Sequence, residues 1–143
     1  MYKILVVDDE DKIRDLIKKY AVYEGYTVSE ATNGLEAVEL CERFVFDLII
    51  MDIMMPKLDG YSAVREIKEF CNTPVIMLSA RGEEYDKIYG FEIGIDDYIV
   101  KPFSARELMY RIEAILKRTL GMPKDVFKFN ELEVDFSARK VSI

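Results

Sequence analysis

The feature that most constrains the fold of this chain is an alternation of short apolar runs with longer amphipathic stretches. The apolar runs are Ile4–Val7, Tyr26–Ala31, Leu48–Met51, Val75–Leu78 and Tyr98–Val100. They are mainly continuous rather than alternating in polarity, which is typical of strands that are covered on both faces. We therefore expect five buried strands, each followed by another kind of element.

The stretches between these runs carry apolar residues at intervals of three and four, which predicts helices. The expected helices cover residues 11–24, 33–44, 60–70, 83–93 and 104–118. Asn33 and Ser104 are expected N-caps, Ser104 as part of a capping box with Glu107, and Gly94 is an expected C-cap. Five strand–helix units with crossovers of this length predict an α/β fold built on a five-stranded, doubly wound parallel sheet.

The end of the chain follows a different pattern. Residues 1–119 contain the predicted α/β domain, and residues 120–126, with Gly121 and Pro123, are expected to be a linker. Residues 127–143 alternate apolar and polar side chains, as half-buried antiparallel strands do. We interpret them as a truncated β-rich C-terminal appendage, since so few residues cannot bury a core alone.

Composition narrows the chemistry and the location. The chain has no histidine and a formal net charge of −7, so we expect neither histidine-based catalysis nor direct nucleic-acid binding by this piece. Cys41 and Cys71 lack metal-binding spacing and are expected to be reduced thiols. The chain opens directly on a strand-like segment, without a signal peptide or a long apolar span. A cytoplasmic protein without membrane contact is expected.

Polar side chains stand where the predicted strands end. They are Asp8, Asp9, Asp52, Ser79 and Lys101. In an open parallel sheet, ligands bind beyond the carboxyl ends of the strands. Taken singly, each residue has an ordinary alternative as a turn, a helix cap or a surface side chain. If the first and third strands are neighbours, however, three carboxylates meet and repel each other by roughly 1–4 kcal/mol per pair.

A divalent cation with oxygen ligands would offset that repulsion, and Mg²⁺ favours one or two carboxylates together with waters and a phosphate. The ammonium of Lys101 would add a second positive charge. Pro102 restricts the backbone next to Lys101, where a cis peptide bond is possible. The hydroxyl of Ser79 could donate to a phosphoryl oxygen.

Four motifs in this order resemble those of response-regulator receiver domains, over about residues 3–118. The motifs are Ile4–Glu10, Asp47–Pro56 with Asp59-Gly60, Pro74–Ala80 and Asp96–Phe103. The resemblance implies the flavodoxin-like receiver fold, with Asp52 as the phosphoacceptor for a sensor histidine kinase. It also implies self-catalysed, Mg²⁺- or Mn²⁺-dependent phosphotransfer and slow autodephosphorylation rather than enzymatic turnover.

The same resemblance assigns roles at the site. Asp9, Asp52 and the backbone carbonyl of Met54 would bind the metal directly, and Asp8 would bind it through water. Ser79 and Lys101 would bind the phosphoryl group, and Tyr98 would turn inward when Ser79 moves. We further hypothesise that Met54 and Arg81 tune the lifetime of the phosphorylated state.

A second set of residues resembles the dimerisation face of the winged-helix (OmpR/PhoB-type) response regulators. These residues are Lys87, Ile88, Phe91, Asp96, Asp97, Glu107, Tyr110 and Arg111. The resemblance implies a phosphorylation-dependent homodimer through the fourth helix, fifth strand and fifth helix, with Lys87–Glu107 and Asp97–Arg111 as pairs between subunits. Residues 127–143 resemble the first strands of the DNA-binding domain of this class, so DNA binding would require the part that is missing here.

Three other functions are weighed against this one. A nucleotide- or flavin-binding module needs a phosphate loop after the first strand, where this chain has Asp8–Asp11. A phosphohydrolase with an Asp nucleophile typically has a second acid two residues later, a position that Met54 occupies. A phosphorylation-independent interaction domain would not need the full set of Asp9, Asp52, Ser79 and Lys101.

Overall fold

The computed structural model describes residues 1–80 and 87–120. Within them, five strands and five helices alternate along the chain. The strands are β1 (Lys3–Val7), β2 (Thr27–Ala31), β3 (Leu48–Asp52), β4 (Val75–Ser79) and β5 (Asp97–Val100). The helices are α1 (Asp11–Tyr23), α2 (Gly34–Arg43), α3 (Gly60–Lys68), α4 (Lys87–Glu92) and α5 (Ala105–Leu120). Most expected boundaries agree with these to within two residues.

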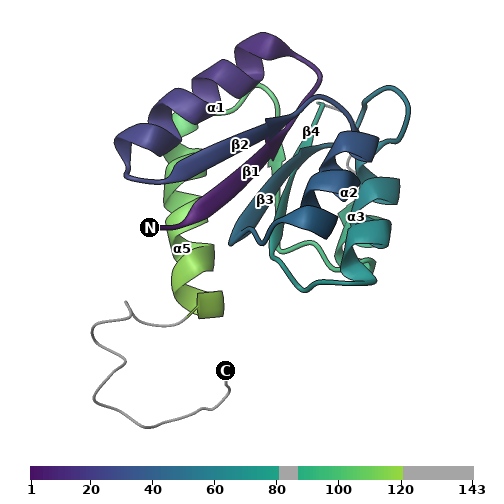
Figure 1. Cartoon of the computed structure of the whole chain (residues 1–143). Coiled ribbons are helices and arrows are strands. Elements are labelled where there is room, and N and C mark those ends of the chain that lie inside the picture. Colours follow the sequence, from purple (N-terminus) through teal and green to yellow (C-terminus); the bar gives the residue numbers. More distant parts are fainter. Residues whose placement is uncertain (81–86, 121–143) are drawn as a thin grey trace, which may run out of the picture. The chain divides into compact units, whose positions relative to one another are not determined.

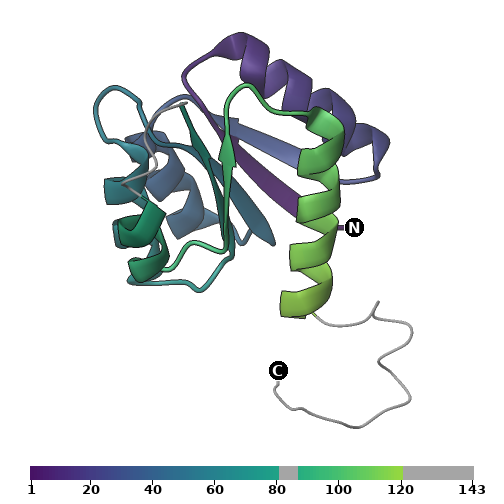
Figure 2. The same cartoon turned by 180° about the vertical axis from the view of Figure 1, so that it is seen from behind.

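The strands form one parallel sheet in the order β2-β1-β3-β4-β5. Helix α1 covers one face of the sheet, and α2, α3 and α4 lie over the other (Figures 1 and 2). The predicted doubly wound α/β fold is therefore confirmed. The expected pairing of the first and third strands is also confirmed, with Val7 opposite Met51.

The expectation that all five strands are covered on both faces is wrong for the two edge strands. Every residue of β3 and β4 is buried, and in β1 only Lys3 is exposed. Strands β2 and β5 are only partly buried, because each has a neighbour on one side alone. The three central strands therefore carry the continuous apolar core.

The expected caps are present in the structure. The side chain of Asn33 accepts a hydrogen bond from the backbone N–H of Glu36 at 2.9 Å, and the hydroxyl of Ser104 accepts one from Glu107 at 3.2 Å. The Glu107 carboxylate binds Arg111, so only this half of the expected capping box is seen among the hydrogen bonds of the described residues. Gly94 has φ +105°, the left-handed conformation expected of a C-cap glycine.

The chain divides into two compact units, residues 1–111 and 112–143, and α5 runs across the boundary. In the described part of the second unit, Lys117 and Glu113 form an ion pair at 3.7 Å on successive turns. Arg81, residues 83–86 of the fourth expected helix, the linker from 121 onward and the strands expected in 127–143 lie outside the described residues. Across the described ranges, no helix combines the length and apolar character needed to cross a bilayer.

Candidate functional site

Three carboxylates converge at the carboxyl end of the sheet. One oxygen from each of Asp8, Asp9 and Asp52 lies within 4.8 Å of the others. The register explains this convergence, because Val7 is paired with Met51 and the next residue on each strand is an aspartate. Asp8 is fully buried and Asp52 is 4% exposed, whereas Asp9 faces solvent. The cluster thus has a buried base and an open side.

Lys101 brings the compensating positive charge. Its Nζ lies 3.1 Å from Oδ2 of Asp8 and 3.2 Å from Oδ1 of Asp52. The backbone N–H of Lys101 donates to the carbonyl of Ser79 at 2.7 Å, which ties the residue to the end of β4. The Lys101–Pro102 peptide bond is cis. One ammonium is thus shared between two carboxylates from neighbouring strands.

Burial and charge both act on the protonation of the site. Burial, together with the nearby charge of Asp8, raises the pKa of Asp52 to about 7, although Lys101 opposes the shift. Burial also raises the pKa of Asp8, against the hydrogen bond from the Glu10 N–H and the charge of Lys101. Burial would lower the pKa of Lys101, but the charges of Asp52 and Asp8 outweigh it and raise that pKa. Without a metal, negative charge is in excess here.

The expected switch residues Ser79 and Tyr98 lie on β4 and β5. The Ser79 side chain is buried at the end of β4, and its hydroxyl donates to the carbonyl of Ala80 at 3.0 Å. Tyr98 pairs with Met77 in the sheet and packs, partly buried, against the core on the side of α3. Its hydroxyl is hydrogen-bonded to that of Tyr61 at 2.5 Å.

Two glycines allow the loop after β3 to close tightly over the end of the sheet. A Cβ on Gly60 would lie 2.2 Å from the carbonyl oxygen of Asp52, and one on Gly34 would lie 2.2 Å from that of Leu58. The backbone N–H of Gly60 donates to Ile53 at 2.8 Å, and that of Gly34 donates to Leu58 at 3.1 Å. The absence of side chains at these positions therefore sets how the backbone beyond Asp52 is held.

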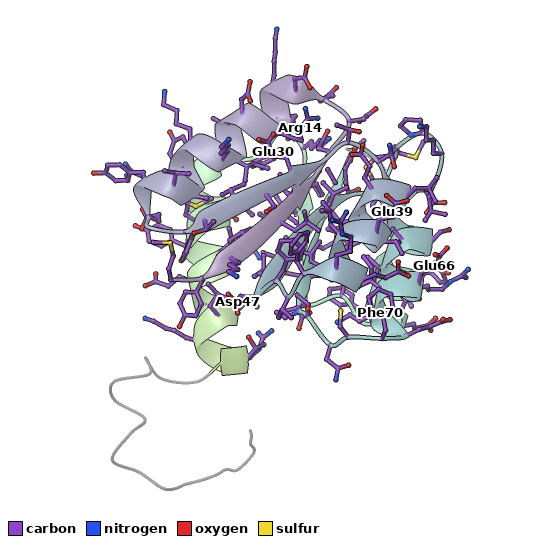
Figure 3. The ribbon with its side chains drawn as sticks, viewed as in Figure 1. Arg14, Glu30, Glu39, Asp47, Glu66 and Phe70 are labelled. Atoms are coloured by element: carbon purple, nitrogen blue, oxygen red, sulfur yellow. The ribbon has the colours of Figure 1, made fainter. Side chains whose placement is uncertain are left out.

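Arg14 supports the acidic pair from α1. It is 9% exposed, its Nη1 donates to the carbonyl of Asp8 at 2.7 Å, and its Nε donates to Glu30 at 3.0 Å. It also pairs with Asp11. Figure 3 shows Arg14 and Glu30 next to each other where α1 passes β2. The guanidinium thus fixes the backbone of Asp8 without contacting its carboxylate.

The remaining site residues expected from the sequence are more scattered. The side chain of Met54, two residues after Asp52, is exposed. Arg81 and the side chain of Lys87 lie outside what the structure describes. Ile88, Phe91 and Tyr110 are exposed apolar residues, as a face for a partner requires.

Four charged members of the expected dimer face, Asp96, Asp97, Glu107 and Arg111, have partners within the chain. Arg111 pairs with Asp97 at 2.8 Å and with Glu107 at 2.9 Å. Asp96 lies at the opposite end of the sheet from the acidic cluster, where its carboxylate accepts a hydrogen bond from the N–H of Val75 at 3.0 Å. Asp96 therefore fastens the start of β4 to the chain before β5.

Sequence reasoning missed three contributors to the site: Arg14, Gly60 and Tyr61. The spacing of Arg14 from Asp11, three residues along a helix, was a usable signal for their pairing. The Asp59-Gly60 pair was noted, but the approach of Gly60 to the Asp52 carbonyl depends on the tertiary structure. Nothing in the sequence indicates that the hydroxyl of Tyr61 contacts that of Tyr98.

Comparison with known proteins agrees with this geometry. Residues 4–113 match the family model described as response regulator receiver domain. The chain belongs to this family. It is the receiver domain of a two-component response regulator, and its acidic cluster lies at the end of the sheet where the motif residues predicted it.

Relatives of the receiver domain include a curated regulator and solved structures. The chain is 44% identical over 147 residues to "Transcriptional regulatory protein SrrA" of Staphylococcus aureus (strain NCTC 8325 / PS 47), and the match covers 97% of the chain and 61% of that protein. The receiver domain of the Francisella response regulator 1452 is 42% identical, with a TM-score of 0.78 over 82% of this chain and 98% of that one. The "BeF3 Activated DrrB Receiver Domain" is 32% identical, with a TM-score of 0.76 over 82% of this chain and 99% of that one.

Proposed function

We propose that this receiver domain accepts a phosphoryl group on Asp52 from the phosphohistidine of a sensor kinase, and that the acyl phosphate acts as a switch. The convergence of Asp8, Asp9 and Asp52, with Lys101 paired to two of them, is the observation that carries the proposal. Asp52 is nearly buried yet borders an acidic cluster with an open side, as a nucleophile that must meet a charged donor requires.

The donor set fits a hard divalent cation. Asp9, Asp52 and the backbone carbonyl of Met54 would hold Mg²⁺ or Mn²⁺ directly, and Asp8 would hold it through water. Such an ion, when bound, neutralises charge on the oxygens of the transferring phosphoryl group. The all-oxygen set, with three negative charges and one ammonium, leaves negative charge for a cation to balance.

The chain's own groups carry out the transfer mainly by positioning. An oxygen of the Asp52 carboxylate attacks the phosphorus in line. A P–O bond forms, the P–N bond to the donor imidazole breaks, and the imidazole keeps the bonding electron pair. Lys101, whose Nζ lies 3.2 Å from Oδ1 of Asp52, would stabilise the added negative charge. Water later cleaves the acyl phosphate and releases inorganic phosphate, so the domain catalyses its own modification rather than a turnover reaction.

The new phosphoryl group would attract the Ser79 hydroxyl, which now donates to the carbonyl of Ala80. That displacement would open space next to β4 and favour the packed, inward position of Tyr98. The movement would reach α4, β5 and the start of α5, where Ile88, Phe91 and Tyr110 are exposed. We propose that this face forms a homodimer after phosphorylation. In the dimer, Arg111 would pair with Asp97 of the second copy instead of its own, and Lys87 would pair with Glu107 of the second copy.

The parent protein is proposed to be a cytoplasmic transcription regulator of the winged-helix class. The relative from S. aureus is named a transcriptional regulatory protein, and this chain spans 61% of its length. In this proposal, residues 1–119 form the receiver, 120–126 the linker and 127–143 the first strands of the DNA-binding domain. The receiver itself would not contact DNA, because the whole chain carries a formal net charge of −7 and DNA is also negatively charged.

Phosphorylation by a small phosphodonor tests the proposal directly. We expect acetyl phosphate to add one phosphoryl group to the chain in the presence of Mg²⁺, measured as intact mass. The added mass should disappear in EDTA and in Asp52→Ala. Asp97→Ala, which removes a carboxylate outside the cluster, is the matched control and should still be labelled. Labelling of Asp52→Ala at the wild-type level would contradict the proposal.

The lifetime hypothesis for Met54 has its own test. Met54→Ala shortens an exposed side chain two residues after Asp52. If that side chain shields the acyl phosphate as proposed, water should reach the phosphate more easily in the variant. We expect its half-life to fall severalfold, measured by the decay of the phosphorylated mass after removal of the donor. Val45→Ala, an exposed substitution before β3, at the opposite end of the sheet, should leave the half-life unchanged. Exchange of the side chains at positions 54 and 81 should also change it, and an unaltered half-life would reject the hypothesis.

A further inference from the structure

A group of tyrosines connects the proposed switch residue to two helices. The hydroxyl of Tyr98 on β5 is hydrogen-bonded to that of Tyr61 on α3 at 2.5 Å. The Tyr61 ring meets the ring of Tyr89 on α4 edge-on, with centroids 5.2 Å apart. The hydroxyl of Tyr89 accepts a hydrogen bond from Nη1 of Arg65 at 2.9 Å. These contacts run from β5 through α3 to α4 and back to α3.

Gly90 on α4 lies close to the rings of both Tyr61 and Tyr98. A Cβ at this position would lie 3.1 Å from Cε1 of Tyr61 and 3.4 Å from Cε2 of Tyr98, and 2.8 Å from Cδ1 of Ile95. Gly90 itself is buried between these side chains. A side chain at this position of α4 would therefore press on Ile95 and on the Tyr61 ring, whereas it would only touch the Tyr98 ring.

We propose that Tyr61 is a positioning residue that holds Tyr98 in its packed position through the bond between the two hydroxyls. Tyr61 is 9% exposed and belongs to the core cluster, whereas Tyr98 is only partly buried at the edge of that cluster. The more deeply buried ring of Tyr61 thus anchors the ring of Tyr98. Because α3 starts at Gly60 against the carbonyl of Asp52, the anchor belongs to the same rigid element that borders the phosphoacceptor.

The expected size of the effect follows from the net contribution of a neutral hydrogen bond. Loss of one bond should change the ratio of packed to solvent-facing Tyr98 about fivefold, which corresponds to about 1 kcal/mol. Tyr61→Phe removes only the hydroxyl oxygen and keeps the ring that packs against Tyr89. It therefore tests the bond without opening a cavity.

Fluorine NMR of the full chain labelled with 3-fluorotyrosine measures the position of Tyr98. Its signal is assigned by its loss in Tyr98→Phe, and its exposure is read from the relaxation caused by a soluble paramagnetic agent. We expect exposure of Tyr98 to rise severalfold in Tyr61→Phe and to stay unchanged in Tyr20→Phe, a control on α1. Gly90→Ala should also raise it, because the added Cβ presses on the Tyr61 ring, whose hydroxyl binds that of Tyr98. Unchanged exposure of Tyr98 in Tyr61→Phe would overturn the proposal.

The link to phosphorylation rests on the proposed function and is measured separately. Beryllofluoride, used with Mg²⁺ as a phosphoryl analogue, should bind Tyr61→Phe two- to fivefold more weakly than the wild type. In a Tyr98→Phe background, Tyr61→Phe should have no further effect. Equal weakening in both backgrounds, or unchanged affinity, would refute a role through Tyr98. If the wild type does not bind beryllofluoride, the proposed function fails, and the relaxation measurement still decides the positioning role.

Discussion

Gly60→Ala is expected to destabilise the receiver domain by about 3 kcal/mol, the upper end of the usual cost of overpacking. The added Cβ would lie 2.2 Å from the carbonyl oxygen of Asp52 and 2.9 Å from the Cα of Ile53. Both atoms are backbone, so no side chain can turn away to relieve the overlap. Either α3 must move outward or the end of β3 must shift.

The change should therefore damage the site as well as the fold. A shift at the end of β3 moves the Asp52 carboxylate relative to Asp8 and Lys101, and we expect weaker Mg²⁺ binding in the fraction that remains folded. Urea unfolding in EDTA measures the first effect, and a Mg²⁺ titration of the folded protein measures the second.

Gly25→Ala is the matched control for this prediction. Gly25 has φ +94°, so alanine is strained there, but its Cβ would meet nothing within 4 Å. We expect a loss of about 1–2 kcal/mol from the backbone alone and no change in Mg²⁺ affinity. If Gly60→Ala were no more costly than Gly25→Ala, the close approach of α3 to the Asp52 carbonyl would not constrain the protein as described.

The sequence was most informative where function depends on strand ends. Asp8, Asp52 and Lys101 could be placed together because parallel strands share one carboxyl edge, and that edge needs only the strand order and approximate boundaries. Ser79 follows from the same rule. Placing these residues required no knowledge of side-chain conformation, and the structure pairs Lys101 with both Asp8 and Asp52.

The contacts that the sequence did not reveal depend on side-chain direction or on close backbone approach. Asp96 was assigned to a surface face, yet its carboxylate binds the N–H of Val75. Arg111 reaches Asp97 within its own chain. Both outcomes depend on which way a side chain points from a known backbone position. The Tyr61–Tyr98 bond depends on how α3 and β5 lie relative to each other, which periodicity does not specify.

The second prediction with a large effect concerns the charge of Asp52. Asp52→Asn should be more stable than the wild type at pH 8 in EDTA, because it removes a buried negative charge next to Asp8. The pKa of Asp52 is about 7 in the folded protein, above the ordinary value of 3.8. Between these two values the folded state holds a proton that the unfolded state has released, so wild-type stability falls as the pH rises through this window.

At pH 8 the carboxylate is charged in both states, and the full penalty applies. A pKa shift of this size corresponds to an upper limit on the order of 4 kcal/mol for the gain in unfolding free energy. Asp52→Asn also loses the ion pair with Lys101, so we expect a gain of a few kcal/mol. The gap between Asp52→Asn and the wild type should close towards pH 4, where Asp52 is protonated when folded. Urea unfolding at several pH values measures this dependence.

Mg²⁺ supplies the decisive contrast. An ion bound only by the folded state at 100 times its dissociation constant adds about 2.7 kcal/mol of stability. At pH 8 the wild type should gain most of this stability from Mg²⁺, whereas Asp52→Asn, with one ligand charge fewer, should gain less. Mg²⁺ should therefore reduce or reverse the difference in unfolding free energy between the two proteins. Asp47→Asn, a carboxylate next to β3 but outside the cluster, should behave like the wild type throughout. If the stability difference between Asp52→Asn and the wild type were independent of both pH and Mg²⁺, the buried charge of Asp52 would not be what destabilises the folded protein.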